Sequence, residues 1–234
     1  YTFSMNAVVE ELKAGISSII STIIFEAGSN DYRLGLVLAD EGTTSTPAYA
    51  TSTDYLALPA SQRVINTGAS DYQFITAVEM FPAAPFNNQA SFETQIAKIN
   101  TGNTLPADWP LGTGSSVPEP TDQALGLIVE SQEFLGAFRS GVAKYVLIYT
   151  DALPSGNDDA FTSTDVSRLH SLAITCATNG IKVFILGEGV NKTYTSASGS
   201  ITYPWRTLAT ATSGTYTASY DTASVIAQIT NACS

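Results

Sequence analysis

Charged side chains are scarce in this sequence, and positive ones are the scarcest. Asp, Glu, Lys and Arg make up 13% of the 234 residues, about half of the roughly 25% that is usual for soluble domains. Ten Lys and Arg stand against 21 Asp and Glu, which leaves a formal net charge of −11. The chain therefore lacks the basic surface that attracts nucleic-acid phosphates or anionic lipid headgroups. We expect neither nucleic acid nor an anionic membrane as a partner.

Histidine and cysteine are also nearly absent. Around the single histidine, His170, we can assemble neither a Ser–His–Asp nor a Cys–His arrangement, and there is no glycine-rich phosphate loop. We therefore expect that the protein is not an enzyme. The two cysteines, Cys176 and Cys233, fit neither the spacing of a zinc ribbon nor that of a CxxC redox pair. Two buried thiols or one disulfide remain, and the low lysine content favours the disulfide.

Long apolar runs are missing as well. A membrane-spanning helix needs about 18 or more consecutive apolar residues, and the most apolar run, from 16 to 25, is interrupted by Ser17, Ser18, Ser21 and Thr22. We therefore expect no membrane insertion. Ser, Thr, Asn and Tyr supply the polar surface in place of charge, a composition common in secreted, surface-displayed and virion proteins. An extracellular, cell-surface or virion-surface location is the expectation.

The chain has the size and the hydrophobic content, 44%, of one sizeable α/β domain spanning residues 1–234. From Asn6 to Glu26 apolar residues recur at steps of three and four, which predicts a helix with Gly28 as its C-cap. Uninterrupted apolar runs predict strands buried on both faces of a parallel sheet. These runs are Leu34–Ala39, Tyr145–Tyr149 and Ile181–Leu186.

The remaining elements alternate between helices and strands. Helices are predicted at a short segment capped by Ser91, at Thr121–Phe138, from Thr164 to Asn179, at Trp205–Ala211 and at Thr222–Ala232. An edge strand is predicted at Tyr72–Phe81, a last strand at Thr215–Tyr220, and long loops at Asp40–Asn66 and Thr101–Pro120. Such alternation is typical of a doubly wound, mostly parallel sheet flanked by helices.

Oxygen-bearing side chains occur at three places that such a sheet brings to one edge. Thr2 and Ser4 precede the first helix, Thr121 begins a later helix, and Asp151 ends a buried strand. Ligands of doubly wound sheets bind beyond the carboxyl ends of the strands. Hydroxyls and few carboxylates suit a divalent cation, Mg²⁺ or Ca²⁺ with Mn²⁺ as a third option, which then accepts one more carboxylate from outside.

Each of these residues also has a simpler interpretation. Thr2 and Ser4 stand before an apolar helical run, where Ser and Thr commonly serve as N-caps. Asp122, beside Thr121, is interpreted as a first-turn acid favoured by the helix dipole rather than as a ligand.

The order of these segments resembles that of a von Willebrand factor A domain, the fold also found in integrin I domains. The metal-ion-dependent adhesion site of that family has the pattern Asp-x-Ser/Thr-x-Ser, then a Thr, then an Asp. Thr2 and Ser4 match the two hydroxyls, Thr121 in Pro-Thr-Asp-Gln-Ala-Leu matches the Thr, and Asp151 in Ile-Tyr-Thr-Asp-Ala-Leu-Pro matches the Asp. The segments 180–187 and 211–216 are similar to the family's next strand and to the entry to its last strand.

The resemblance implies an extracellular adhesion or protein-interaction module. The bound cation would bridge to an acidic group on a protein or glycan partner. The alternative is a structural subunit of a filament, pilus, appendage or virion, in which the metal site is vestigial.

The chain departs from the family at its start. The leading Asp of the family's motif would fall one place before Tyr1, and the central first strand would lie further upstream. Without that strand its neighbours would be separated by about two strand spacings, roughly 9–10 Å, and two rows of backbone groups would lack partners. We therefore expect a strand from an upstream segment, a bound cleaved fragment or a neighbouring subunit to lie between Leu34–Ala39 and Tyr145–Tyr149.

Overall fold

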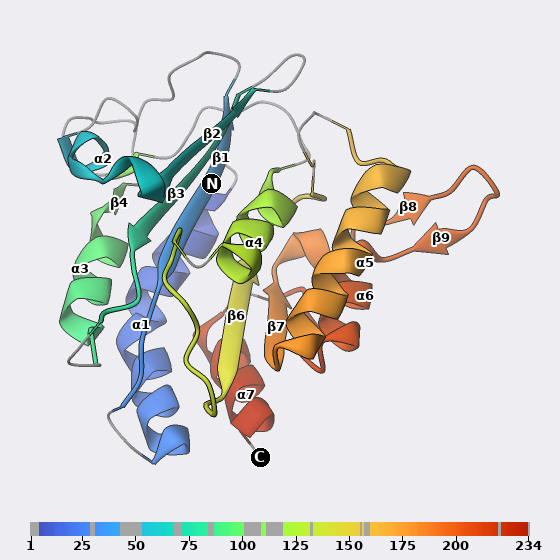
Figure 1. Cartoon of the computed structure of the whole chain (residues 1–234). Helices are drawn as coiled ribbons and strands as arrows, with labels where there is room; N and C mark the ends of the chain where they lie inside the picture. The colour runs from blue at the N-terminus through green and yellow to red at the C-terminus, as the bar shows by residue number, and fades with distance from the viewer. Residues whose placement is uncertain are drawn as a thin grey trace.

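The computed structural model of the chain has a mixed α/β fold with helices on both sides of its strands (Figure 1). It describes residues 5–28, 31–42, 53–67, 72–83, 87–100, 109–110, 119–131, 133–154, 156, 160–219 and 221–233. Thr2 and Ser4 lie outside the described residues.

The helices and strands follow one another in the order that Figure 1 labels. The α-helices are α1 (Asn6–Ala27), α2 (Thr53–Ala57), α3 (Gln89–Lys98), α4 (Thr121–Glu130), α5 (Ser163–Thr178), α6 (Pro204–Ala211) and α7 (Thr222–Cys233). The longer strands are β1 (Leu36–Gly42), β2 (Arg63–Thr67), β3 (Tyr72–Glu79), β6 (Lys144–Tyr149) and β7 (Ile181–Leu186). The two-residue strands are β4 (Ile99–Asn100), β5 (Trp109–Pro110), β8 (Tyr194–Thr195), β9 (Ile201–Thr202) and β10 (Tyr216–Thr217), and two 3₁₀ turns are η3 (Ala60–Gln62) and η4 (Glu188–Asn191).

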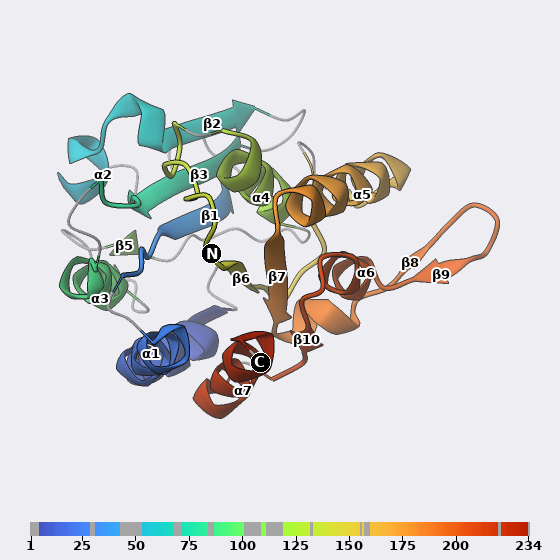
Figure 2. The same cartoon turned by 60° about the horizontal axis from the view of Figure 1, so that its bottom comes forward.

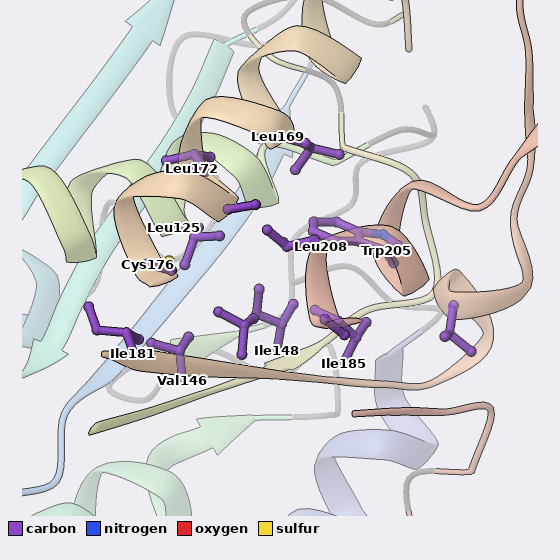
Figure 3. Close-up of a cluster of buried hydrophobic side chains, with 14 residues drawn as sticks. Leu125, Val146, Ile148, Leu169, Leu172, Cys176, Ile181, Ile185, Trp205 and Leu208 are labelled. Atoms are coloured by element: carbon purple, nitrogen blue, oxygen red, sulfur yellow. The ribbon is translucent and has the colours of Figure 1, made fainter. Parts of the chain in front are cut away.

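A three-stranded parallel sheet has the order β10-β7-β6. Its long strands coincide with the two apolar runs predicted at residues 145–149 and 181–186, and β6 begins one residue earlier than predicted. Side chains of β7 alternate between two apolar clusters. Phe184 and Leu186 pack towards α1 and α7, whereas Val183 and Ile185 pack towards α5 and α6. Figure 3 shows Ile185 in the second of these clusters. Both faces of this sheet are therefore covered by helices, as predicted for a parallel sheet.

The second three-stranded sheet is antiparallel and has the order β1-β3-β2. The strand predicted at Leu34–Ala39 is displaced to Leu36–Gly42 and pairs antiparallel with β3, so its assignment to a parallel sheet was wrong for this edge. Likewise β3 is the middle strand rather than an edge, because β2 pairs with its far side. The segment predicted as a loop from Asp40 to Asn66 contains the helix α2 and all of β2 except its last residue.

Two layers of helices enclose the strands (Figure 2). One layer holds α1, α3 and α7, and the other holds α4, α5 and α6. Helix α1 matches its predicted span closely, and Gly28 caps it in the left-handed conformation with φ of 65°. Within the described part of the chain, no helix has both the length and the apolarity needed to cross a membrane.

Helices α1 and α4 each contact both sheets. From α1, Ile16 and Ile20 pack on the core beneath β1 and β3, and Ile19 packs with side chains of β7. From α4, Ala124 packs with side chains of β3, and Leu125 packs with side chains of β6 and β7. The two sheets are therefore held between the same two helix layers.

Helix α4 ends at Glu130, eight residues before the predicted end. Ser131 has extended backbone angles and closes the helix. Leu135, which suggested a longer helix, and its neighbour Phe134 are buried in a loop against the β3 side of the core instead. Periodicity alone did not separate a buried loop from a further helical turn.

The start of helix α3 also differs from the prediction. Asn88, rather than Ser91, is its N-cap. The Asn88 side chain bonds the backbone of Leu34, accepting from its N–H at 2.9 Å and donating to its carbonyl oxygen at 2.8 Å. Ser91 Oγ donates to Glu79 instead. The side-chain amide of Asn88 thereby supplies hydrogen-bond partners to the backbone of Leu34, just before β1 begins.

Cys176 is a free thiol, and no disulfide occurs in the part of the chain that the structure describes. Its side chain is fully buried between α5 and the parallel sheet (Figure 3). Burial, together with the nearby Glu130 carboxylate, raises the pKa of the Cys176 thiol to about 11. The thiol is therefore mostly protonated at neutral pH and poorly reactive. The disulfide predicted for Cys176 is not found, because this side chain fills the core instead.

The close approach of residue 214 to β7 yields a stability prediction. A Cβ on Gly214 would lie 1.9 Å from the carbonyl oxygen of Val183, a backbone atom that cannot move aside. We expect Gly214→Ala to lower the free energy of unfolding by about 3 kcal/mol, measured by urea titration. The control is Gly199→Ala, since Gly199 has φ of 82° but a Cβ there would meet no atom within 4 Å; its loss should stay near 1 kcal/mol. Equal losses would contradict the steric account.

Candidate functional site

The structure places Thr121 and Asp151 at the rim of one cavity. The cavity has a volume of about 710 Å³, lies between β1 and β6, and is lined by both residues. Thr121 is the first residue of α4, and Asp151 follows the end of β6. Both side chains are half-buried. The predicted hydroxyl and carboxylate therefore face a common space, whereas the predicted Thr2 and Ser4 lie outside the described residues.

The backbone that carries Asp151 is held firmly on both sides. The N–H of Thr150 donates to the carbonyl oxygen of Leu186 at 3.1 Å, which extends the pairing of β6 with β7. The indole N–H of the buried Trp205 donates to the carbonyl oxygen of Ala152 at 2.7 Å. Thr150 and Ala152 are both buried, so Asp151 projects from a fixed segment. Such rigidity favours ligand binding, because little conformational freedom is lost.

A second backbone connection joins the start of α4 to the segment after β6. Glu119 N–H donates to the carbonyl oxygen of Leu153 at 2.9 Å, and residues 119 and 154 form an isolated parallel bridge. Thr121 N–H then donates to the carbonyl oxygen of Glu119 at 2.8 Å. Thr121 and Asp151 therefore belong to two segments that are hydrogen-bonded to one another, although 30 positions separate them in the sequence.

The cavity rim contains a further carboxylate that the sequence reasoning missed. Glu119 is buried, with 4% of its surface exposed, and lines the cavity together with Thr121, Thr150 and Asp151. It stands between Pro118 and Pro120 in a stretch that was predicted as a loop. The sequence feature that could have indicated Glu119 is its position between two prolines, just before a predicted helix. The rim thus offers two carboxylates and the hydroxyl of Thr121, whereas the hydroxyl of Thr150 is hydrogen-bonded to the backbone of Ala152.

Asp122 occupies the first turn of α4 as predicted, but it is completely buried. Its Oδ1 accepts from the N–H of Gly156 at 3.1 Å, and its Oδ2 has no hydrogen-bond partner among the described residues. Burial raises the pKa of Asp122 to about 6, the bond from Gly156 opposes this rise, and the nearby Asp165 carboxylate adds to it. The Asp122 side chain therefore points towards α5 and Gly156, and it is not an exposed acid at the start of the helix.

The rim presents carboxylate and hydroxyl oxygens, which are the kind of donor that hard cations take. Divalent Mg²⁺ and Ca²⁺ take oxygen ligands and keep water in the remaining positions. Among the described residues, no group of three or more His, Cys, Asp or Glu side chains forms a metal site. A cation here would be bound by Asp151 and Thr121, with Glu119 and Thr150 nearby. Water would fill the remaining positions of the cation, and an external carboxylate could replace one of these waters.

Comparisons with known proteins do not identify a relative. No protein-family model, curated protein or solved structure matches the chain.

The buried Asp122 predicts how stability depends on pH. Its folded pKa is raised to about 6, so the folded state binds the proton more tightly than the unfolded state does. This contribution to stability is complete below about pH 4 and is lost as the pH rises towards 6. Asn at this position mimics the protonated form. We expect Asp122→Asn to exceed the parent chain by about 2–3 kcal/mol at pH 7 and to match it near pH 4.

Urea titrations from pH 4 to pH 7.5, with chelator present throughout, measure this difference. Asp31→Asn serves as the control, because the Asp31 side chain is exposed and pairs with Arg139 at the surface. A difference between Asp122→Asn and the parent chain that does not change with pH would contradict the burial argument.

Proposed function

We propose that the chain is an interaction module of the von Willebrand factor A type, which binds an acidic group of a protein or glycan partner through a divalent cation. The observation that carries the proposal is the convergence of Thr121 and Asp151 on one cavity rim. The finer fold belongs to the proposal too: the two sheets are the two sides of one doubly wound sheet. The helix layers common to both sheets support this view.

In this proposal the chain's residues position the cation and leave one of its coordination positions open. Asp151 supplies a full negative charge from a rigid segment, and Thr121 supplies a neutral hydroxyl from the start of α4. The Glu119 carboxylate lies at the same rim. The hydroxyls of Thr2 and Ser4 would complete the set. The bound cation contributes positive charge at the rim, and a carboxylate of the partner would be its last ligand.

The overall charge of the chain makes the cation necessary for this kind of recognition. With a net charge of −11, the surface repels acidic partners at long range. A divalent cation at the rim offsets the negative charge there and gives the carboxylate of the partner a positive ion to bind. Partner binding should therefore require the cation, rather than merely being strengthened by it.

Direct titration with cations tests the site without knowledge of the partner. We expect Mg²⁺, Ca²⁺ or Mn²⁺ to bind with a stoichiometry of one, measured by isothermal titration calorimetry after chelator treatment. Asp151→Asn and Thr121→Ala should each weaken binding at least tenfold, because each removes one of few ligands. Thr178→Ala is the matched control, since Thr178 is exposed at the far end of α5. Binding that is equal in all four proteins would contradict the proposal.

A structural subunit of a filament, pilus, appendage or virion is the second candidate function. The observation that favours it is the open space between β1 and β6, which a strand from a neighbouring copy could enter. In that case the purified chain should form polymers in chelator, visible by electron microscopy and by light scattering. A monodisperse monomer at high concentration would exclude this candidate.

A further inference from the structure

Arg206, the third residue of α6, carries a positive charge that no acid of the described chain neutralises. Ion pairs within the described residues involve Lys13, Lys98, Arg139 and Arg168, and none involves Arg206. Acids outnumber bases in the whole chain by 21 to ten. A shortage of carboxylates therefore does not explain why Arg206 lacks an acidic partner, and its charge can act on an external anion.

Two tyrosine rings lie against the guanidinium of Arg206. Its Cζ is over the ring of Tyr203, 4.7 Å from the centroid, and over the ring of Tyr216, 4.9 Å from the centroid. The face of an aromatic ring attracts a cation electrostatically and helps to hold it in place. Both tyrosines are also accessible, with 41% of Tyr203 and 42% of Tyr216 exposed. The guanidinium is therefore oriented before a ligand arrives, and exposed aromatic surface adjoins it.

Protein oxygens occupy one edge of this guanidinium. Nε donates to the carbonyl oxygen of Val190 at 3.2 Å, and Nη2 donates to Oδ1 of Asn191. Both acceptors belong to η4, and Nε and Nη2 form one edge of the planar group. The other edge consists of Nη1 and the second N–H of Nη2, and Nη1 has no hydrogen-bond partner among the described residues. This free edge matches the two oxygens of a carboxylate, which a guanidinium binds through two parallel N–H bonds.

The elements around Arg206 are fixed by the core of the protein. Trp205, the preceding residue, is fully buried. Tyr216 belongs to β10, which pairs with the middle strand β7. The turn η4 is attached to the end of β6, because the N–H of Gly189 donates to the carbonyl oxygen of Thr150 at 3.0 Å. A ligand of Arg206 would therefore bind to a pre-formed site, at a small cost in conformational freedom.

We propose that the free edge of Arg206 is a binding site for a carboxylate, namely an Asp or Glu side chain of a protein partner. Tyr203 directly follows the hairpin of β8 and β9, which projects from the molecule beside α6 (Figures 1 and 2). The site needs no metal ion, because the arginine itself supplies the positive charge. Neither Arg206 nor its two tyrosines line the cavity, so the inference does not rest on the cation proposed at the rim.

The surroundings of this site favour a protein partner over an acidic glycan. Tyrosine and arginine are the residues that protein interfaces contain in excess, and they carry much of the binding energy there. Ile201, two positions before Tyr203, is 64% exposed. An exposed aliphatic side chain suits an apolar side chain of a peptide better than the hydroxyl groups of a sugar. We therefore expect the acidic residue of the partner to be flanked by an apolar residue.

Titration of the full chain with small probes tests the site. The probes are the capped peptide Gly-Leu-Glu-Glu-Leu-Gly, its uncharged counterpart Gly-Leu-Gln-Gln-Leu-Gly and a trimer of galacturonic acid. NMR of the isotope-labelled chain follows the Nε–Hε signal of Arg206 and the backbone N–H signal of Asn191. Chelator is present in every titration, so failure of this proposal is distinct from failure of the cation proposal.

We expect the Glu peptide to shift both signals saturably and the Gln peptide to bind roughly tenfold more weakly. The galacturonic acid trimer, which lacks apolar side chains, should also bind more weakly than the Glu peptide.

Variants of the chain separate the guanidinium from its charge. Arg206→Lys keeps the charge but removes the fork, so it should weaken binding of the Glu peptide roughly fivefold. Tyr216→Ala should weaken it about threefold, whereas Tyr216→Phe, which keeps the ring, should not. Arg139→Lys is the matched control, since Arg139 pairs with Asp31, and it should bind like the parent chain. Near-ultraviolet circular dichroism checks that each variant is folded.

Three outcomes would overturn the proposal. In the first, Arg206→Lys binds the Glu peptide as tightly as the parent chain does, so that charge alone suffices. In the second, the Gln peptide binds as tightly as the Glu peptide, which would indicate a purely apolar surface. In the third, the Glu peptide shifts neither signal; binding of the galacturonic acid trimer alone would then assign the carboxylate to a glycan.

Discussion

The burial of the apolar stripe of helix α1 is the interaction on which the arrangement of the two sheets depends. Its buried side chains include Val8, Val9, Ile16, Ile19 and Ile20. Each such side chain stabilises the folded state by about 1.5–3 kcal/mol, so the stripe contributes on the order of 10 kcal/mol at most. That is comparable to the net stability of a whole domain. The β1 sheet and the β7 sheet are thus attached to one helix, although no strand joins them among the described residues.

The elements that could be predicted from the sequence are those with a clear apolar pattern within their own residues. Helices α1 and α5 and strands β6 and β7 have long periodic or continuous apolar patterns, and the structure confirms them. The errors occur at strands whose place in a sheet is determined by pairing with another strand. Strand β2 is short and lies in a stretch rich in Ser, Thr and Ala, so its apolar pattern was too brief to detect. The partial alternation of residues 72–81 suggested an edge strand, but β2 pairs with β3 and makes it the middle strand.

The candidate site was predictable to a similar degree. Thr121 and Asp151 could be inferred because the carboxyl ends of parallel strands and the starts of the following helices meet at one edge. Burial of Glu119 and Asp122 could not, since it results from contacts with residues far along the chain, such as Leu153 and Gly156. Sequence position indicates that an acid begins a helix, but it does not indicate what covers that acid.

The hydrogen bond from Trp205 to the segment after β6 has a practical consequence. The indole is fully buried and bonds the carbonyl oxygen of the residue that follows Asp151. An indole's emission depends on the field and the hydrogen bonding around it, so any event that shifts this loop alters the fluorescence of Trp205. Trp205 is thus an intrinsic fluorescent reporter next to Asp151, the candidate metal-ligating residue. The rim of the cavity can be monitored in solution without a chemical label.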